Sequence, residues 1–112
     1  MGIAKALKAS SVPRERLFIT TKVPACGVQG ISRKACGADS VAAADSNLRE
    51  LGLPYVDLLL IHFPPPLGCR ANCAVIREQW KALTDAHLRT NRTRALGVSN
   101  FCISCLECLA ST

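Results

Sequence analysis

The stretch Leu51-Gly52-Leu53-Pro54-Tyr55-Val56-Asp57-Leu58-Leu59-Leu60-Ile61-His62-Phe63-Pro64 decides the fold. Its centre, from Leu58 to Ile61, is a continuous apolar run without alternation, which is typical of a parallel strand covered on both faces. His62 follows the run directly, and a row of three prolines then ends the strand. We therefore expect a buried strand that stops next to a histidine.

Two further apolar stretches end in the same way. Residues 17–21 run into Lys22, and residues 95–98 run into Ser99 and Asn100. The steps from lysine to histidine to serine are 40 and 37 residues. Each step has room for a strand, a helix and two loops, which is the repeating unit of parallel α/β folds. Such folds place their chemistry at the carboxyl ends of the strands, where these polar residues would lie.

Helical periodicity occupies the intervals between the strands. One amphipathic helix is expected on Val41, Ala44, Leu48 and Leu51, with Asp39 or Ser40 as N-cap and Gly52 just past its end. A second is expected on Ile76, Trp80, Leu83 and His87 after Asn72 as a cap, with shorter helices at residues 2–10 and from Ser104 onward.

Three segments of the chain resemble the NAD(P)H-dependent aldo-keto reductases, which are (β/α)8 barrels. Residues 14–23 resemble the third strand of that family, residues 51–64 the approach to the fourth strand and its end, and residues 94–101 the fifth. Three matches in order at suitable spacing are more specific than any one alone. The resemblance implies an α/β fold, a partial (β/α)8 TIM barrel of about three parallel strands with intervening helices.

The resemblance also implies carbonyl reduction by hydride transfer from NADP(H), with a tyrosine as general acid and a neighbouring lysine that favours its phenolate. Lys22 matches that lysine, and His62 matches the histidine that orients the substrate carbonyl. Ser99 and Asn100 match the residues that hydrogen-bond the nicotinamide carboxamide. The implied partner is a small aldehyde or ketone.

The chain departs from the family at the general acid. The aspartate and tyrosine of the family precede the segment that residues 2–7 resemble. The single tyrosine of this chain, Tyr55, precedes His62 by seven residues, on the approach to the same strand. At about 3.3 Å per residue the two would be roughly 23 Å apart, so Tyr55 cannot serve as the acid.

Length limits what the chain can do alone. A complete barrel takes roughly 200 to more than 400 residues, and three of the eight strands are accounted for here. We expect residues 1–112 to be an internal fragment of one aldo-keto reductase domain, inactive in isolation. The alternative is a degenerate remnant without catalysis that acts as a binding or interaction module, through its cysteines.

Seven cysteines form the strongest competing feature. Cys69-x3-Cys73 and Cys102-x2-Cys105-x2-Cys108 suggest a zinc or iron–sulfur site, but this spacing alone is weak. On a helix from Ser104 the last two thiols share one packed face and need no metal, so we expect none. An odd count argues against a fully paired disulfide set, and a cytosolic chain keeps its thiols reduced. Residues 25–37 form an irregular pocket loop in which Cys26 or Cys36 could be redox-sensitive.

Charge and hydropathy favour no other class. The net charge of +6 and pI near 9.2 permit an acidic partner, but the basic residues are scattered without aromatic interleaving, so we expect no nucleic-acid binding. No apolar run approaches the roughly 18 residues of a membrane span, and the start lacks a secretory apolar region. We expect a cytoplasmic protein that does not bind membranes.

An open three-stranded slice of a barrel leaves both sheet edges unpaired and one face without its usual packing. We therefore expect the isolated chain to be weakly stable and to self-associate. Analytical ultracentrifugation and thermal melting test this, and a monodisperse monomer with a sharp two-state melt would contradict it.

Overall fold

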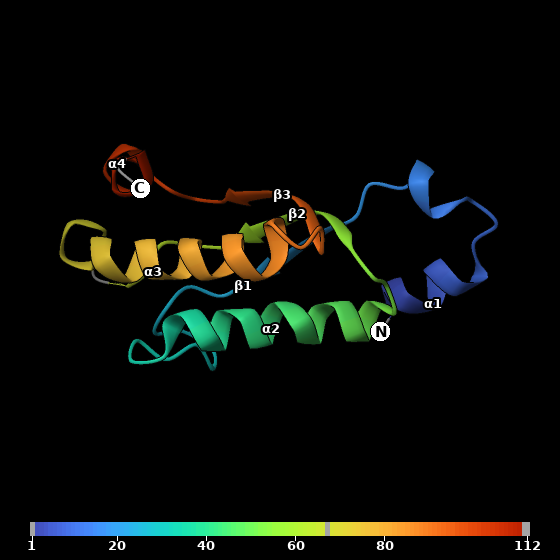
Figure 1. Ribbon diagram of the computed structural model, residues 1–112, viewed down its shortest axis with the longest axis horizontal. Coiled ribbons are helices and arrows are strands. Elements are labelled where there is room, and N and C mark those ends of the chain that lie inside the picture. The colour runs from blue at the N-terminus through green and yellow to red at the C-terminus, as the bar shows by residue number, and fades with distance from the viewer. Residues whose placement is uncertain (1, 67, 111–112) are drawn as a thin grey trace.

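The computed structural model describes residues 2–66 and 68–110. Its centre is a parallel sheet of β1 (Thr20–Val23), β2 (Val56–Ile61) and β3 (Thr93–Val98), with β2 in the middle (Figure 1). The three strands, their order and their direction confirm the predicted partial α/β barrel. Within the described part of the chain, no helix combines the length and the apolar composition that a membrane span requires.

Strand β1 begins later than the sequence suggested and includes Lys22. The amide of Ile19 donates to the carboxylate of Asp57 at 2.8 Å, and the carbonyl of Ile19 accepts from the Asp57 amide at 2.9 Å. The Asp57 side chain thus binds the Ile19 amide, which in a regular strand would donate to a backbone carbonyl of the neighbouring strand. A short 3-10 turn, η1 (Arg14–Arg16), precedes this segment. Residues 17–19 therefore approach the sheet without belonging to β1.

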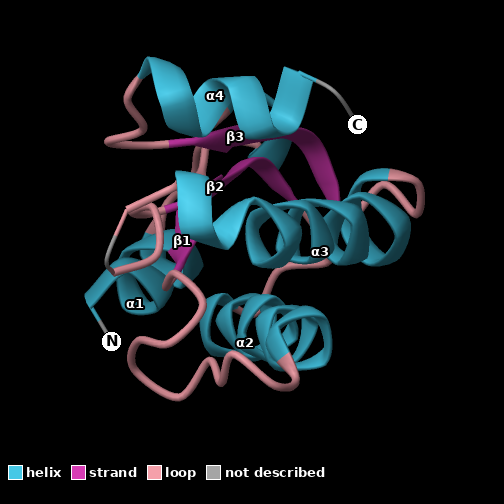
Figure 2. Ribbon diagram, turned by 90° about the vertical axis from the view of Figure 1, so that its left-hand side faces the viewer, coloured by secondary structure: helices cyan, strands magenta, loops and turns pink. Residues whose placement is uncertain are grey.

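Two long helices, α2 (Cys36–Leu51) and α3 (Cys73–Leu83), lie side by side against one face of the sheet (Figures 1 and 2). The apolar positions predicted for the first helix are on its inner side. The buried core joins residues of both helices to residues of β1 and β2: Val23, Ala44, Leu48, Leu51, Val56, Leu59, Ile61 and Leu83. Trp80, one of the apolar positions that predicted the second helix, packs against this core.

Helix α2 starts before both predicted caps. Asp39 lies in the first turn, where its carboxylate accepts from the amide and hydroxyl of Ser32, and these bonds hold the pKa of Asp39 below its ordinary value. Ser40 is buried and accepts a hydrogen bond from Gln79 at 2.9 Å. Gly52 ends the helix with a φ of 69°, the left-handed cap that the sequence predicted.

Helix α3 follows the short turn η2 (Arg70–Asn72) and continues into a π-helical turn, η3 (Thr84–Leu88). Asn72 stands at the predicted cap position, but its side chain donates to the carbonyls of Pro66 and Gly68 instead of to the helix. His87 is buried, as the periodicity predicted, and bonds to Asp45 at 2.9 Å. Burial lowers the pKa of His87 despite that carboxylate.

The two short helices agree with the sequence. Helix α1 (Gly2–Ala9) contacts α2, and α4 (Ile103–Ala110) packs on α3 beyond β3 (Figure 2). Neither lies on the second face of the sheet. On that face Lys22 is exposed while Leu58 and Leu60 are only partly buried. By strand alternation Val56 and Thr93 belong to this face too and are buried, so the second face is open toward the carboxyl ends of the strands.

The amino-terminal end of the sheet is held by an ion pair. The Arg14 guanidinium lies 2.9 Å from the Asp57 carboxylate, and it also stacks over the ring of Tyr55 at 4.1 Å. Arg94 lies over the same ring at 4.8 Å. Tyr55 thus packs against two arginines at the end of β2 opposite His62. This position agrees with the prediction that Tyr55 cannot serve as the general acid.

Removal of the Asp57 carboxylate should destabilise the fold. Burial by itself would raise the pKa of Asp57, but the Ile19 amide and Arg14 outweigh it, so the pKa lies below its ordinary value. The stabilisation is then complete above that ordinary value and is lost as pH falls through the lowered one. We expect Asp57→Ala to lower the free energy of unfolding by about 2 kcal/mol at neutral pH.

Urea unfolding at several pH values measures the effect. Asp85→Ala is the matched control, because that carboxylate is paired with Lys81 on an exposed helix face and should matter little. Equal losses from both variants would contradict the proposed role of Asp57.

Candidate functional site

The backbone register aligns the carboxyl ends of the three strands. Val23, Ile61 and Val98 are paired across the sheet. One residue further on, the His62 amide donates to the carbonyl of Val23 and the Ser99 amide to that of Ile61, both at 2.9 Å. The strand hydrogen bonds therefore continue past the strand ends and place His62 beside Ser99.

Lys22 lies on the same open face, at the level of Leu60, two residues before His62 along β2. It is paired with Leu60 on β2, which in turn is paired with Gly97 on β3. Because side chains two residues apart in a strand share a face, Lys22, His62 and Ser99 all project from the open side of the sheet. A Cβ at Gly97 would approach Leu60 to 3.0 Å, so glycine leaves space in the middle of this row.

Asn100 ties two strand ends together. Its amide nitrogen donates to the carbonyl of His62 at 2.8 Å and to the hydroxyl of Ser99 at 3.0 Å. The backbone of Asn100 has a φ of 63°, a left-handed conformation that asparagine tolerates better than most residues. With the nitrogen engaged, the amide oxygen is the acceptor that remains for a bound group.

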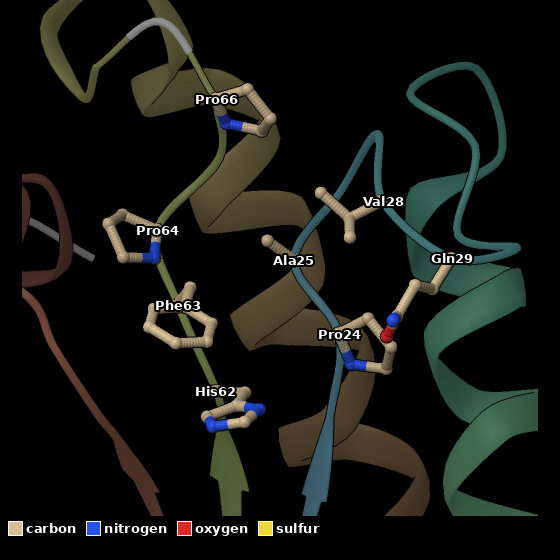
Figure 3. A pocket seen from close by; sticks show the side chains of 8 residues that line it. All are labelled: Pro24, Ala25, Val28, Gln29, His62, Phe63, Pro64 and Pro66. Atoms are coloured by element: carbon tan, nitrogen blue, oxygen red, sulfur yellow. The ribbon is translucent and has the colours of Figure 1, made fainter.

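A cavity of 350 Å³ opens beside His62 (Figure 3). Figure 3 shows the segments that follow β1 and β2 side by side, with the His62 ring at the end of β2. Phe63 stacks on that ring at a centroid distance of 4.3 Å. The lining is mostly apolar: Pro24, Ala25, Val28, Gln29, His62, Phe63, Pro64 and Pro66.

The loop after β1 shapes this cavity, as its position predicted. Val28 and Ile31 form a short antiparallel bridge around Gln29 and Gly30, which have φ values of 45° and 88°. Two positive φ values in the central positions are the geometry of a tight hairpin turn. The turn projects Val28 and Gln29 toward the cavity (Figure 3).

The expectation of reduced thiols is wrong for six of the seven cysteines. The structure forms the disulfides Cys26–Cys36, Cys69–Cys105 and Cys73–Cys108, with Cα separations of 5.5, 5.1 and 5.2 Å. The pocket-loop cysteines are therefore bonded to each other. The sequence could not show the other two pairs, because they depend on α4 packing against the start of α3. Cys102 is left as a free, exposed thiol.

Cys105 and Cys108 are buried on one side of α4, which confirms the predicted packed face. In addition, the sulfur atoms of Cys69, Cys102 and Cys105 all lie within 4.8 Å of one another. Two of these sulfurs share a disulfide bond and cannot act as thiolate ligands in that state. That the cysteines hold no metal stays a prediction.

The arrangement brings together the four residues predicted from the sequence. An ammonium group, an imidazole, a hydroxyl and an amide lie at the carboxyl ends of the three strands, and the imidazole of His62 lines an apolar cavity. Such a set can bind and orient a polar group on an otherwise apolar small molecule. Gln29, from the predicted pocket loop, also lines the cavity, as does Phe63, which was not predicted as a site residue although its position just after His62 was the available signal.

Comparisons with known proteins agree with this geometry. A model described as the aldo/keto reductase family matches residues 1–111. The chain is 39% identical over 111 residues to an NAD/NADP-dependent indole-3-acetaldehyde reductase of Schizosaccharomyces pombe, covering 98% of this chain and 34% of the relative. It is 33% identical over 122 residues to an aldehyde reductase of Saccharomyces cerevisiae, covering 91% and 36%. The chain thus spans about a third of the length of these relatives.

Solved structures are similar over the same extent. A crystal structure of an aldo/keto reductase from Brucella melitensis matches with a TM-score of 0.76 and 32% identity, over 98% of this chain and 38% of that one. An aldo-keto reductase of Bombyx mori in complex with NADP matches with a TM-score of 0.69 and 34% identity, over 99% and 34%.

Asn100→Asp should remove the hydrogen bond to the His62 carbonyl while keeping a residue that tolerates the left-handed backbone at this position. Aspartate also tolerates a left-handed backbone, but it cannot donate to the His62 carbonyl. We expect a loss of about 1 kcal/mol in unfolding free energy and a shifted His62 ring signal in proton NMR. Asn91→Asp is the matched control, since Asn91 has a φ of 61° in a different turn. An unchanged His62 signal in Asn100→Asp would contradict this role.

Proposed function

Because this chain belongs to the aldo/keto reductase family, we propose that Lys22, His62, Ser99 and Asn100 form part of an active site that reduces aldehydes or ketones with NADP(H). The observation that carries the proposal is that Lys22 and His62 lie on the same open face of the sheet and that His62 lines an apolar cavity. The relatives named above have reductase activities in their names, and one solved neighbour holds NADP.

Lys22 supplies positive charge to the floor of the site. Its side chain is exposed on the open face, while its backbone carbonyl is fixed by the Asn47 amide at 2.9 Å. An ammonium group beside a phenol favours the phenolate and lowers the pKa of the phenol toward neutral pH. This is the effect that a general acid for carbonyl reduction needs.

His62 orients the substrate. Its ring borders the cavity, and the backbone on both sides of it is held by the Val23 carbonyl and by Asn100. A ring nitrogen placed in this way can donate to a carbonyl oxygen while the apolar walls hold the rest of the molecule. Stacking on Phe63 further restricts rotation of the ring.

Ser99 and Asn100 fit the carboxamide of a nicotinamide. A carboxamide offers both a donor and an acceptor, and here a hydroxyl and an amide oxygen lie side by side at the end of β3. Bound there, NADP(H) would supply the hydride, and the protein would present one ring face to the cavity. The preference for NADP(H) over NAD(H) rests on the family alone.

We do not expect the 112 residues by themselves to turn over substrate. Tyr55, the single tyrosine, contacts Arg14 and Arg94 at the opposite end of β2. Without a general acid the rate would fall by a factor of roughly 10² to 10⁴. The alternative proposal is a non-catalytic remnant that binds partners through its cysteines, which the three-sulfur group around Cys102 favours.

The test begins with the native protein, captured from its source cells with an antibody raised against residues 68–80. We expect an intact mass far above 12.0 kDa and NADPH-dependent reduction of aldehydes. In that protein Lys22→Met should lower kcat by roughly 10²-fold or more, because the charge that tunes the acid is lost. Lys34→Met is the matched control, since Lys34 is exposed in the loop before α2.

Two outcomes would contradict the proposal. One is full activity in Lys22→Met. The other is a native mass of 12.0 kDa without NADPH oxidation, which would support the non-catalytic alternative.

A further inference from the structure

Three sulfur atoms meet where α4 begins. Cys69 precedes η2, while Cys102 just before α4 and Cys105 in its first turn come 33 and 36 residues later in the chain. The Cys102 sulfur lies 3.4 Å from that of Cys105, which is bonded to Cys69. A free thiol therefore stands in contact with one end of a disulfide bond.

The three sulfurs differ in access to solvent. Cys102 is exposed, whereas Cys69 and Cys105 are only 5% and 1% exposed. Cys102 stands immediately before α4, and Cys105 lies in its first turn. An exposed thiol at a helix N-terminus, followed three residues later by a buried partner, is the arrangement in which a cysteine becomes reactive.

The surroundings favour the thiolate of Cys102. The Ser104 hydroxyl lies 3.1 Å from its sulfur. Hydrogen bonds from that hydroxyl and from the backbone of Cys105 hold the pKa of Cys102 below its ordinary value. The thiolate is the attacking species in disulfide exchange, so the free cysteine is the one suited to attack.

We propose that Cys69, Cys102 and Cys105 form an internal thiol–disulfide exchange site. Cys102 loses its proton to solvent and attacks the sulfur of Cys105. The Cys102–Cys105 bond forms as the Cys69–Cys105 bond breaks, and the electron pair leaves with Cys69, which then takes a proton. One disulfide replaces another, so no outside oxidant or reductant is required.

The different burial of Cys69 and Cys102 determines which of the two disulfides predominates. Cys69 is packed with Ile76 and with the cysteines of α4, and an apolar environment disfavours its thiolate as a leaving group. Cys102 is exposed and hydrogen-bonded, so it is the better place for the unpaired sulfur. The Cys69–Cys105 pairing in the structure is accordingly the major form, and Cys102–Cys105 is the minor one.

Differential labelling of the full chain tests the proposal, because trypsin places Cys69 alone in the peptide 50–70. The protein is purified without reductant and treated with a short pulse of N-ethylmaleimide. It is then denatured, reduced, labelled with iodoacetamide and digested. Maleimide on peptide 50–70 reports the chains in which Cys69 was free.

We expect a reproducible minor fraction of maleimide on this peptide in the wild-type chain, and its loss in Cys102→Ser. Because Cys102 belongs to no disulfide in the resting form, this variant keeps all three bonds. The peptide 23–33, which carries Cys26, is the internal control and should stay free of maleimide in both chains.

A second variant tests the geometry directly. In Cys69→Ser the Cys105 sulfur loses its partner, and air oxidation should then join it to Cys102 within the peptide 95–112. A Cys102 that stays free in this variant would overturn the proposal. Equal maleimide on peptide 50–70 with and without Cys102 would also overturn it, as would a chain purified with zinc on these sulfurs and no disulfide among them.

Discussion

The parallel register of the three strands is the constraint on which the rest of the structure depends. The bonds from the His62 amide to the Val23 carbonyl and from the Ser99 amide to the Ile61 carbonyl carry the ladder past the strand ends. Each functional side chain is attached to a backbone position that a neighbouring strand already holds. Without this alignment, the same side chains would occupy three unrelated loops.

The two ends of the sheet have separate tasks. At the amino-terminal end, Arg14, Asp57 and Tyr55 form a closed set of contacts that fixes the approach to β1. At the carboxyl end, polar groups border a cavity and are less completely paired. This division agrees with the general rule for parallel barrels, in which one end serves stability and the other serves chemistry.

The helices cover only one face of the sheet, and this asymmetry explains much of the surface. Residues such as Leu59 and Ile61 are buried under α2 and α3, while Leu58 and Leu60 on the opposite face stay partly exposed. In a barrel that face points inward and packs against the other strands. The continuous apolar run of β2 is suited to burial on both sides.

Local patterns predicted the elements well and their contacts poorly. The limits of β2 followed from an apolar run bounded by prolines, and the end of α2 followed from Gly52. The start of β1 was wrong because the Ile19 amide bonds to Asp57, 38 residues away. The two disulfides to α4 were missed for the same reason, since their cysteines are separated by 36 and 35 residues.

The sequence by itself determined the type and order of the elements, the family and the four polar residues that follow the strands, because periodicity, turn residues and short motifs are local properties. Only the tertiary structure decided that Lys22, His62 and Ser99 share one face, that the loop after β1 closes a cavity on His62, and that Cys102 lies against a disulfide. These depend on the register of distant segments, which is set by the packing of whole helices against the sheet and not by any single stretch of chain.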